Sequence, residues 1–480
     1  MQIHSMISRR RLLQGSALGL GTVALAQLLE ADGRLTASAT DLKPRKGHFA
    51  PRARAIIQLV QNGGPSQMDL FDPKPELNKH HGEQFHVKAD LQGLGSEANL
   101  LLACPFKFHK HGAAGMEFSE VLTHTPRIAD EICLIRSMYS EHNNHTEALI
   151  MLATGKIFRG RPALGAWVTY ALGTENQNLP AYIVLRDPEG YNTNATLNWD
   201  AGWLPALFAG TEFQSQGTAV LNLHAARPVP EAVQREKLDL LALLNESHRK
   251  PYPRESELET RIRNYELAAR MQLSATEVMD ISKESDATKN LYGLNDPATA
   301  SYGRRCLMAR RLVESGVRFV QVFPPVKPSF QPWDSHTNIK TELPTICSRI
   351  EAPTAGLVLD LKSRGLLDST LVVWAGEFGR QSVSQNETGR DHNRHAFSIW
   401  MAGGGVKAGH THGTTDDFGY KAADKPMSVP DLHATILHQM GIDHRKLTYW
   451  HNGREESLTD VALTGAHVTS DILSKPPAVV

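Results

Sequence analysis

The chain has 480 residues, of which 51 are basic and 51 acidic, and it is 41% hydrophobic and 21% charged. This composition is typical of a globular protein and excludes a disordered or fibrous chain. Because the charges cancel, no overall field recruits nucleic acid or an anionic membrane, so neither is expected as a partner.

The N-terminal segment has the charged-then-apolar order of a bacterial export signal. Arg9 and Arg10 precede residues 12–29, which carry no charged side chain. The paired arginines predict the twin-arginine route, and Ala37-Ser38-Ala39 supplies a small-x-small cleavage site. The alternative is an uncleaved anchor, although its glycines weaken the stretch as a membrane span. The sequence therefore predicts a signal peptide over 1–39 and a periplasmic or extracellular protein without a transmembrane segment after cleavage.

Apolar runs that alternate with helical patterns predict the organisation of the remaining chain. Residues 40–52 are basic and contain proline, as in a linker. Short apolar runs predict strands over 53–60, 132–135, 182–185, 317–323, 371–374 and 397–401. Helical spacing predicts helices over 116–130, 146–153, 164–172, 302–314 and 345–364. This alternation predicts one α/β domain over 53–480, a mostly parallel sheet covered by helices on both faces, with a polar, helical insertion at about 191–300.

Ligands of α/β sheets gather at the carboxyl ends of the strands, which directs attention to the loops there. After the first predicted strand, Asp69 and Asp72 follow a glycine pair. Their carboxylates suit a cation, and the alternative is an ordinary turn with Asx capping. After the second strand, His142, His145 and Thr146 stand directly before a helix. They suit a metal or an anion at the helix N-terminus, or else an N-cap with solvent-facing imidazoles.

Two further loops pair a carboxylate with an imidazole. Asp334-Ser335-His336 brings a hard oxygen close to a ring nitrogen, a combination that suits zinc and similar divalent ions. Alternatively, Asp334 orients His336 or caps the next helix. Asp391 and His392 form the densest ligand-like pair in the chain.

Glu377 lies in a glycine-flanked loop at the end of a buried strand. A carboxylate there is costly unless it is paired or bound to a metal. Arg380 is either its salt-bridge partner or a clamp for an anionic substrate oxygen. The recurrence of such groups at successive strand ends predicts a divalent metal centre, with zinc, calcium and magnesium all left open.

These loops also carry a family resemblance from about Ala53 to the C-terminus. The chain resembles the exported bacterial family called domain of unknown function 1501, which is related to the alkaline phosphatase and sulfatase superfamily. The motifs that carry it are G-G-P-S-Q-M-D-L-F-D-P-K-P (63–75), W-D-S-H (333–336), G-E-F-G-R (376–380), G-R-D-H-N (389–393), G-G-G-V-K-A-G (403–409), T-D-D-F-G-Y (415–420), D-L-H-A-T-I-L (431–437) and L-T-D-V (458–461).

The resemblance implies an alkaline-phosphatase-like fold and metal-dependent hydrolysis of phosphate or sulfate esters of small molecules or glycans. Asp334 and His336 resemble the superfamily's Asp and His ligands in the middle of the chain. Glu377 falls where the superfamily has an Asp, and His392 resembles the His before the following strand. The implied metal set is completed by Asp391, with Asp69 as an addition.

The chain also departs from the superfamily pattern. Gln61 and Asn62 are neutral where an acidic ligand is expected, and Asp69 is the candidate replacement. Phe378 stands in place of a His, and no C-x-P-S-R segment is present. The nucleophile position falls on His145. Three alternatives follow: Thr146 attacks, His145 is a ligand or nucleophile, or water attacks. A catalytically inactive envelope- or carbohydrate-binding protein on the same fold is the competing hypothesis.

Overall fold

The structure, a computed structural model, describes residues 41–474 except 93, 218–219, 221–228 and 252–255. The predicted signal peptide therefore lies outside the described residues. Residues 41–52 form neither helix nor strand, but they pack against the body. Thr174 N donates to Leu42 O over 2.9 Å, and Arg45 N donates to Leu172 O over 2.9 Å.

A nine-stranded sheet forms the centre of the molecule, in the order β12-β4-β11-β8-β1-β7-β5-β6, with β15 also paired to β4. Only β11 is antiparallel to its neighbours, and the other pairs are parallel. All side chains of β1, β5, β7, β8 and β11 are buried, as expected for strands covered on both faces. The strands are β1 (Ala55–Val60), β4 (Ile132–Tyr139), β5 (Tyr182–Leu185), β6 (Thr211–Glu212), β7 (Phe319–Val322), β8 (Thr370–Ala375), β11 (Phe397–Ala402), β12 (His410–His412) and β15 (Met427–Ser428).

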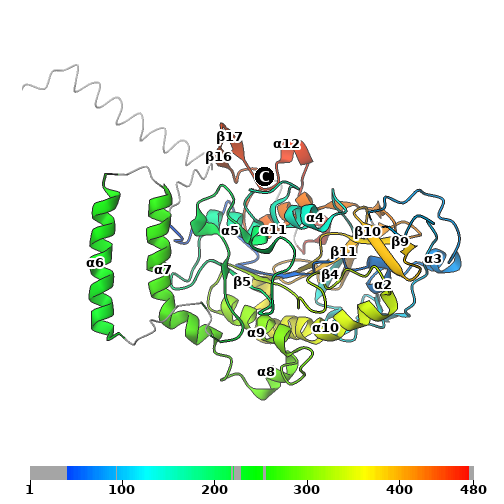
Figure 1. Cartoon of the computed structure of the whole chain (residues 1–480), viewed down its shortest axis with the longest axis horizontal. Coiled ribbons are helices and arrows are strands. Elements are labelled where there is room, and N and C mark those ends of the chain that lie inside the picture. Colours follow the sequence, from blue (N-terminus) through cyan, green and yellow to red (C-terminus); the bar gives the residue numbers. More distant parts are fainter. Residues whose placement is uncertain (1–40, 93, 218–219, 221–228, 252–255, 475–480) are drawn as a thin grey trace, which may run out of the picture.

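Helices cover both faces of this sheet (Figure 1). One layer holds α4 (His145–Thr154), α5 (Leu164–Leu172) and α11 (Val429–Gln439). The opposite layer holds α9 (Ala300–Glu314) and α10 (Ile339–Ser363). The predicted mostly parallel α/β architecture is therefore confirmed.

The helix predicted over 116–130 is wrong. Residues Phe108–His111 (β2) and Met116–Ser119 (β3) form an antiparallel hairpin, and Thr125–Ile128 is a short 3-10 helix. Met116 and Phe118 are buried at alternate positions, which is the period of a strand. The apolar spacing that resembled a helix thus came from two separate elements.

The described part of the segment predicted as an insertion contains the α-helices α6 (Glu231–Arg249), α7 (Ser256–Met279) and α8 (Asp286–Leu291). The first two run side by side and project from the body (Figure 1). The same segment also supplies β6, which pairs with β5 in the main sheet. Within the described residues, no helix combines the length and apolar character needed to span a bilayer.

A second, smaller hairpin stands off the main sheet and bears on the site described below. Its strands are β9 (Gly379–Gln385) and β10 (Gly389–Asn393), paired antiparallel. It packs on its own apolar cluster, which includes Met68, Phe85 and Val383. The remaining elements are α2 (Gln67–Leu70), α3 (Pro75–Lys79), α12 (Val461–Thr464), β13 (Thr414–Thr415), β14 (Ala422–Asp424), β16 (Tyr449–His451) and β17 (Arg454–Glu456).

Candidate metal centre

Four side chains from three parts of the chain converge at the carboxyl edge of the sheet. His145 is the first residue of α4, and the side chain of the N-cap residue Asn144 accepts from Thr146 N. Asp334 and His336 lie in the loop between β7 and α10, and His392 lies on β10. One donor atom of each lies within 4.8 Å of every other. Among the described residues, this is the one cluster of at least three His, Cys, Asp or Glu side chains that meets this spacing.

Asp334 Oδ1 is the centre of the cluster. It lies 2.7 Å from His336 Nε2, 3.1 Å from His392 Nε2 and 3.3 Å from His145 Nε2. The two ring nitrogens His336 Nε2 and His392 Nε2 are themselves only 2.9 Å apart. Three imidazoles therefore direct the same nitrogen, Nε2, at one point.

Glu377 orients the first imidazole. His145 Nδ1 donates to Glu377 Oε1 over 2.8 Å, and Gly63 N donates to the same oxygen over 2.8 Å. Glu377 is completely buried at the end of β8. Because Nδ1 carries the hydrogen, the second ring nitrogen Nε2 is left free to bind an ion. This is the carboxylate–histidine arrangement that supports metal ligands in proteins.

The second imidazole, that of His336, is oriented by the side-chain amide of Gln385 and not by a carboxylate. His336 Nδ1 lies at hydrogen-bonding distance from Gln385 Oε1. The amide orientation is set because Gln385 Nε2 donates to the Leu94 carbonyl over 2.8 Å, and a carbonyl can only accept. The oxygen of Gln385 must then face the ring, so His336 carries its hydrogen on Nδ1 and presents a bare Nε2.

Charges around the cluster favour a cation at its centre. Burial alone would raise the pKa of Asp334, but Arg380 and the three imidazoles hold that pKa far below its usual range. Burial lowers the pKa of His392 to about 4, so this ring is neutral at pH 7, the form that binds metals. Burial also opposes charge on His145, yet the nearby carboxylates of Asp334 and Glu377 outweigh it and raise the pKa of His145.

The residues present fit a divalent ion. A tetrahedral zinc with bonds of about 2.0–2.1 Å separates its ligand atoms by about 3.3 Å, close to the 2.7–3.3 Å from Asp334 Oδ1 to the three nitrogens. A ring nitrogen that carries no hydrogen repels a neighbouring carboxylate oxygen unless a proton or a metal ion lies between the two atoms. Within the described chain, the buried atoms His145 Nε2, His392 Nδ1 and Glu377 Oε2 have no hydrogen-bond partner. Three nitrogens and one oxygen form a ligand set that zinc and similar ions accept.

Three residues predicted as ligands lie outside this group of four: Glu377, which pairs with His145, and also Asp69 and Asp391. Asp69 forms a fully buried ion pair with Arg390, with Oδ2–Nε at 2.6 Å and Oδ1–Nη2 at 3.1 Å. Asp391 accepts from Gln92 N over 2.9 Å and from the N–H of His392 over 2.7 Å. Asp391 lies where the β9–β10 register shifts, between Arg390 and His392, and it is not one of the four clustered side chains.

Arg380 and Thr146, which were predicted to act on substrate, differ in their burial and in their contacts. Arg380 is fully buried, pairs with Asp334 at 2.7 Å and donates to the carbonyls of Gly64 (2.8 Å) and Arg390 (3.0 Å). Its partner is thus the central carboxylate, while Glu377 pairs with His145. Thr146 is half-buried, next to His145 in the first turn of α4, and its carbonyl accepts from Asn194 Nδ2.

Phe378 packs against two of the imidazoles. Its ring centroid lies 4.9 Å from that of His145 and 4.6 Å from that of His392. A Cβ on Gly64 would approach the Phe378 ring to 2.6 Å, so the glycine turn after β1 holds this ring in place. An apolar wall on one side of the cluster limits water there and strengthens the interactions among its charges.

Gln385 is the site residue that sequence reasoning missed. It lies 49 positions from His336 in a polar segment without any ligand-like spacing. Residues 379–385 contain one hydrophobic side chain, that of Val383, so the sequence offered no periodic signal for this strand.

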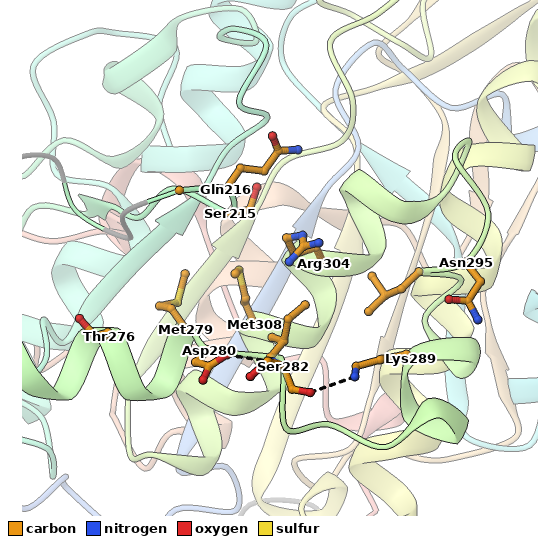
Figure 2. Close-up of a pocket in the computed structure, with 13 residues that line it drawn as sticks. Ser215, Gln216, Thr276, Met279, Asp280, Ser282, Lys289, Asn295, Arg304 and Met308 are labelled. Carbon is orange, nitrogen blue, oxygen red and sulfur yellow. Dashed lines mark hydrogen bonds between the residues drawn. The ribbon is translucent and has the colours of Figure 1, made fainter.

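A cavity of about 780 Å³ lies elsewhere, between α7, α8 and α9 (Figure 2). Met279, Lys289, Arg304 and Met308 contribute to its lining. None of its lining residues belongs to the cluster around Asp334. The cavity and the candidate metal centre are therefore separate features of the molecule.

A family model described as "Protein of unknown function (DUF1501)" matches residues 53–473. The chain belongs to the DUF1501 family. This membership agrees with the resemblance carried by the W-D-S-H and G-R-D-H-N motifs, which hold Asp334, His336 and His392. No curated protein matches the sequence.

Solved structures show a distant likeness. A protein of that superfamily from Vibrio parahaemolyticus is 10% identical, with a TM-score of 0.37 over 85% of this chain and 71% of its own. Ps i-CgsB in complex with k-i-k-neocarrahexaose is 12% identical, with a TM-score of 0.36 over 82% and 74%. The lipoteichoic acid synthase LtaP from Listeria monocytogenes is 9% identical, with a TM-score of 0.32 over 84% and 76%.

Proposed function

We propose that this DUF1501 protein is a metal-dependent hydrolase of phosphate or sulfate esters that acts outside the cytoplasm. The observation that carries the proposal is the convergence of three imidazole nitrogens on Asp334 Oδ1, within 2.7–3.3 Å. A divalent ion bound there supplies Lewis-acid polarisation of an ester oxygen. The expected substrates are ester-bearing small molecules or glycans.

The protein's own side chains then have separate tasks. His336 and His392 hold the ion together with Asp334, and Arg380 keeps that carboxylate ionised and oriented. His145 stands at the nucleophile position of the superfamily, and its Nδ1 hydrogen bond to Glu377 turns Nε2 toward the cluster. Thr146, next to it on α4, is the alternative nucleophile. The ring of Phe378 shields the imidazoles from water on one side.

Metal analysis of the purified protein tests the first half of the proposal. We expect at least one divalent ion per chain, and we expect His336→Ala combined with His392→Ala to lose it. His412→Ala is the matched control, because His412 is a buried imidazole on β12 outside the cluster. A metal-free wild type, or a double variant with unchanged metal content, would contradict the proposal.

Hydrolysis of aryl phosphate and aryl sulfate tests the second half. Activity should disappear on chelation and return when the metal is restored. His145→Ala and Thr146→Ala, measured separately, identify the nucleophile, because the residue that attacks should cost about 10³-fold or more in kcat in a variant that keeps its metal.

A binding protein that kept the fold without the chemistry is the second candidate. The observation that favours it is Phe378, whose ring occupies the side of the cluster where the superfamily has another His. A protein that holds stoichiometric metal and binds a sugar ester, yet hydrolyses neither aryl ester, would favour this candidate over the hydrolase.

Location outside the cytoplasm is proposed from the twin-arginine leader. A ligand set drawn from positions 145 to 392 exists only in the folded chain. A protein loaded with metal before export must therefore cross the membrane folded, which is what the twin-arginine route allows. If the export route for unfolded chains delivered equally metallated protein, the leader would only direct the protein to the membrane, and folding before export would not be required.

A further inference from the structure

Helix α6 is unusual because little of its surface is buried against the rest of the protein. None of its side chains that the structure describes is buried. The half-buried positions Gln234, Leu238 and Asn245 share one face of the helix, and α7 runs alongside (Figure 1). A helix of this kind derives its stability from burying an apolar face, because its intrinsic propensity is marginal.

A second face of α6 is apolar and points to solvent. Leu240 and Leu244 are 57% and 56% exposed, and Val233 is also exposed. Together with Lys237 and Ser247 they are spaced four, three, four and three residues apart, the pattern of a coiled-coil seam. Leu241 and Leu243 flank this stripe and are exposed too. We call residues 233, 237, 240, 244 and 247 the α6 seam.

We propose that the α6 seam pairs with the α6 seam of a second copy of this chain, antiparallel, so that two α6–α7 hairpins form a four-helix bundle. Residues 237, 240, 244 and 247 of the α6 seam are their own complement about the level of Ala242, since Leu240 then lies opposite Leu244 of the partner subunit. A two-fold contact of this kind uses the same patch on both copies. Antiparallel helix pairs of this geometry are the unit of up-and-down bundles.

Charge selects the antiparallel direction. A parallel pair would place Lys237 against its own copy and Glu236 against its own copy, so like charges would meet. In the antiparallel pair Lys237 faces a serine, its two copies are about 15 Å apart along the helix axis, and Glu236 faces an imidazole, at position 248.

The size of the contact is sufficient for a specific dimer. The helix has 19 residues, so it is about 28 Å long. Contact along this length buries on the order of 500 Å² per copy, or about 1,000 Å² in total, near the lower bound for a specific interface. The apolar seam, rather than a wider surface, supplies most of that area.

Sedimentation velocity of the full-length metallated protein is the first test. We expect the wild type to sediment at twice the mass of one chain, and Leu240→Glu with Leu244→Glu to weaken dimerisation at least tenfold while metal content stays unchanged. Leu463→Glu is the matched control, because Leu463 is exposed on α12, far from α6 (Figure 1). A wild type that stays monomeric at all concentrations, or a dimer that survives both changes, overturns the proposal.

Cysteine cross-linking tests the register and does not depend on removing leucines. Lys237→Cys and Ser247→Cys proteins, mixed and mildly oxidised, should give a disulfide-linked dimer, while each alone should give at least tenfold less. Strong cross-linking by Lys237→Cys alone would show a parallel pair and overturn the antiparallel arrangement. A monomer whose α6 seam binds lipid vesicles, with binding lost in the double Glu variant, would show that a membrane covers this face instead.

Discussion

At the scale of single residues, the metal cluster depends on hydrogen bonds that reach it from outside. The proton on His336 is positioned by the amide of Gln385. We predict that Gln385→Leu, which keeps the volume and removes the acceptor, weakens metal affinity about 10- to 100-fold, as expected for loss of a group that orients a ligand. Competition with a metal-sensitive dye measures this affinity.

Gln439→Leu is the control for that prediction. It removes another buried amide, one that donates to the Gly404 carbonyl over 2.6 Å, and Gln439 is not part of the cluster. Its metal affinity should equal that of the wild type. Equal losses in both variants would mean that the effect of Gln385 is general destabilisation and not ligand orientation.

Asp69 offers a prediction that separates structure from metal binding. It was a predicted ligand, and in the structure it pairs with the fully buried Arg390. Asp69→Asn leaves that guanidinium uncompensated, so the free energy of unfolding should fall by about 3–5 kcal/mol. Urea denaturation measures the loss, and metal content of the folded fraction should not change. Loss of metal without loss of stability would restore Asp69 as a ligand.

The sequence could predict part of the cluster and not all of it. Asp334 and His336 stand two positions apart, and His392 follows an Asp, so local spacing and the family motifs both pointed to them. The residues that orient these side chains could not be predicted from local spacing or family motifs. Gln385 is 49 residues from the ring that it orients, and its role depends on the fold of the β9–β10 hairpin.

At the scale of elements, helix α11 contains a titratable group with a predictable effect. His433 is buried, and its Nε2–H donates to the Leu152 carbonyl over 2.9 Å. Burial lowers the pKa of His433 from 6.5 to about 4. Between these values the unfolded chain binds more protons than the native protein, so stability increases with pH across this window.

We therefore predict that His433 lowers the free energy of unfolding by about 2 kcal/mol between pH 7 and pH 5. Urea titrations at both pH values should show that His433→Gln loses less stability on acidification than the wild type by this amount. Other histidines titrate equally in both proteins and cancel. The same pH dependence in both would show that His433 is not neutral in the native state.

Strands were easier to predict than the polar hairpin. The six buried strands predicted from apolar runs are all present, because a strand covered on both faces is continuously hydrophobic. No strand was predicted over 379–393, since β9 and β10 consist largely of polar residues such as Gln, Ser, Arg and Asn. These polar side chains are buried by hydrogen bonds to distant backbone, as when Gln381 Nε2 donates to the carbonyl of Asp90, and such bonds leave no periodic pattern in the sequence.

At the scale of the whole molecule, the order of the sheet interleaves the two halves of the chain. Strands β4, β1, β5 and β6 precede the α6–α7 hairpin, while β12, β11, β8 and β7 follow it. Neither half can complete the central sheet, because β1 lies between β8 and β7, and β11 lies beside β4. The metal cluster divides in the same way, with His145 in the first half and its three companions in the second.

Covalent continuity at the hairpin is therefore dispensable once the sheet has formed. We predict that residues 1–250 and 251–480, produced together as two polypeptides, assemble into one particle that retains the metal. Produced alone, each should be insoluble. Co-purification on a tag carried by one fragment, followed by metal analysis, is the measurement, and failure to co-purify would contradict it. The strand order thus makes this protein a candidate for fragment complementation, in which recovered metal binding reports that two separately encoded pieces have met.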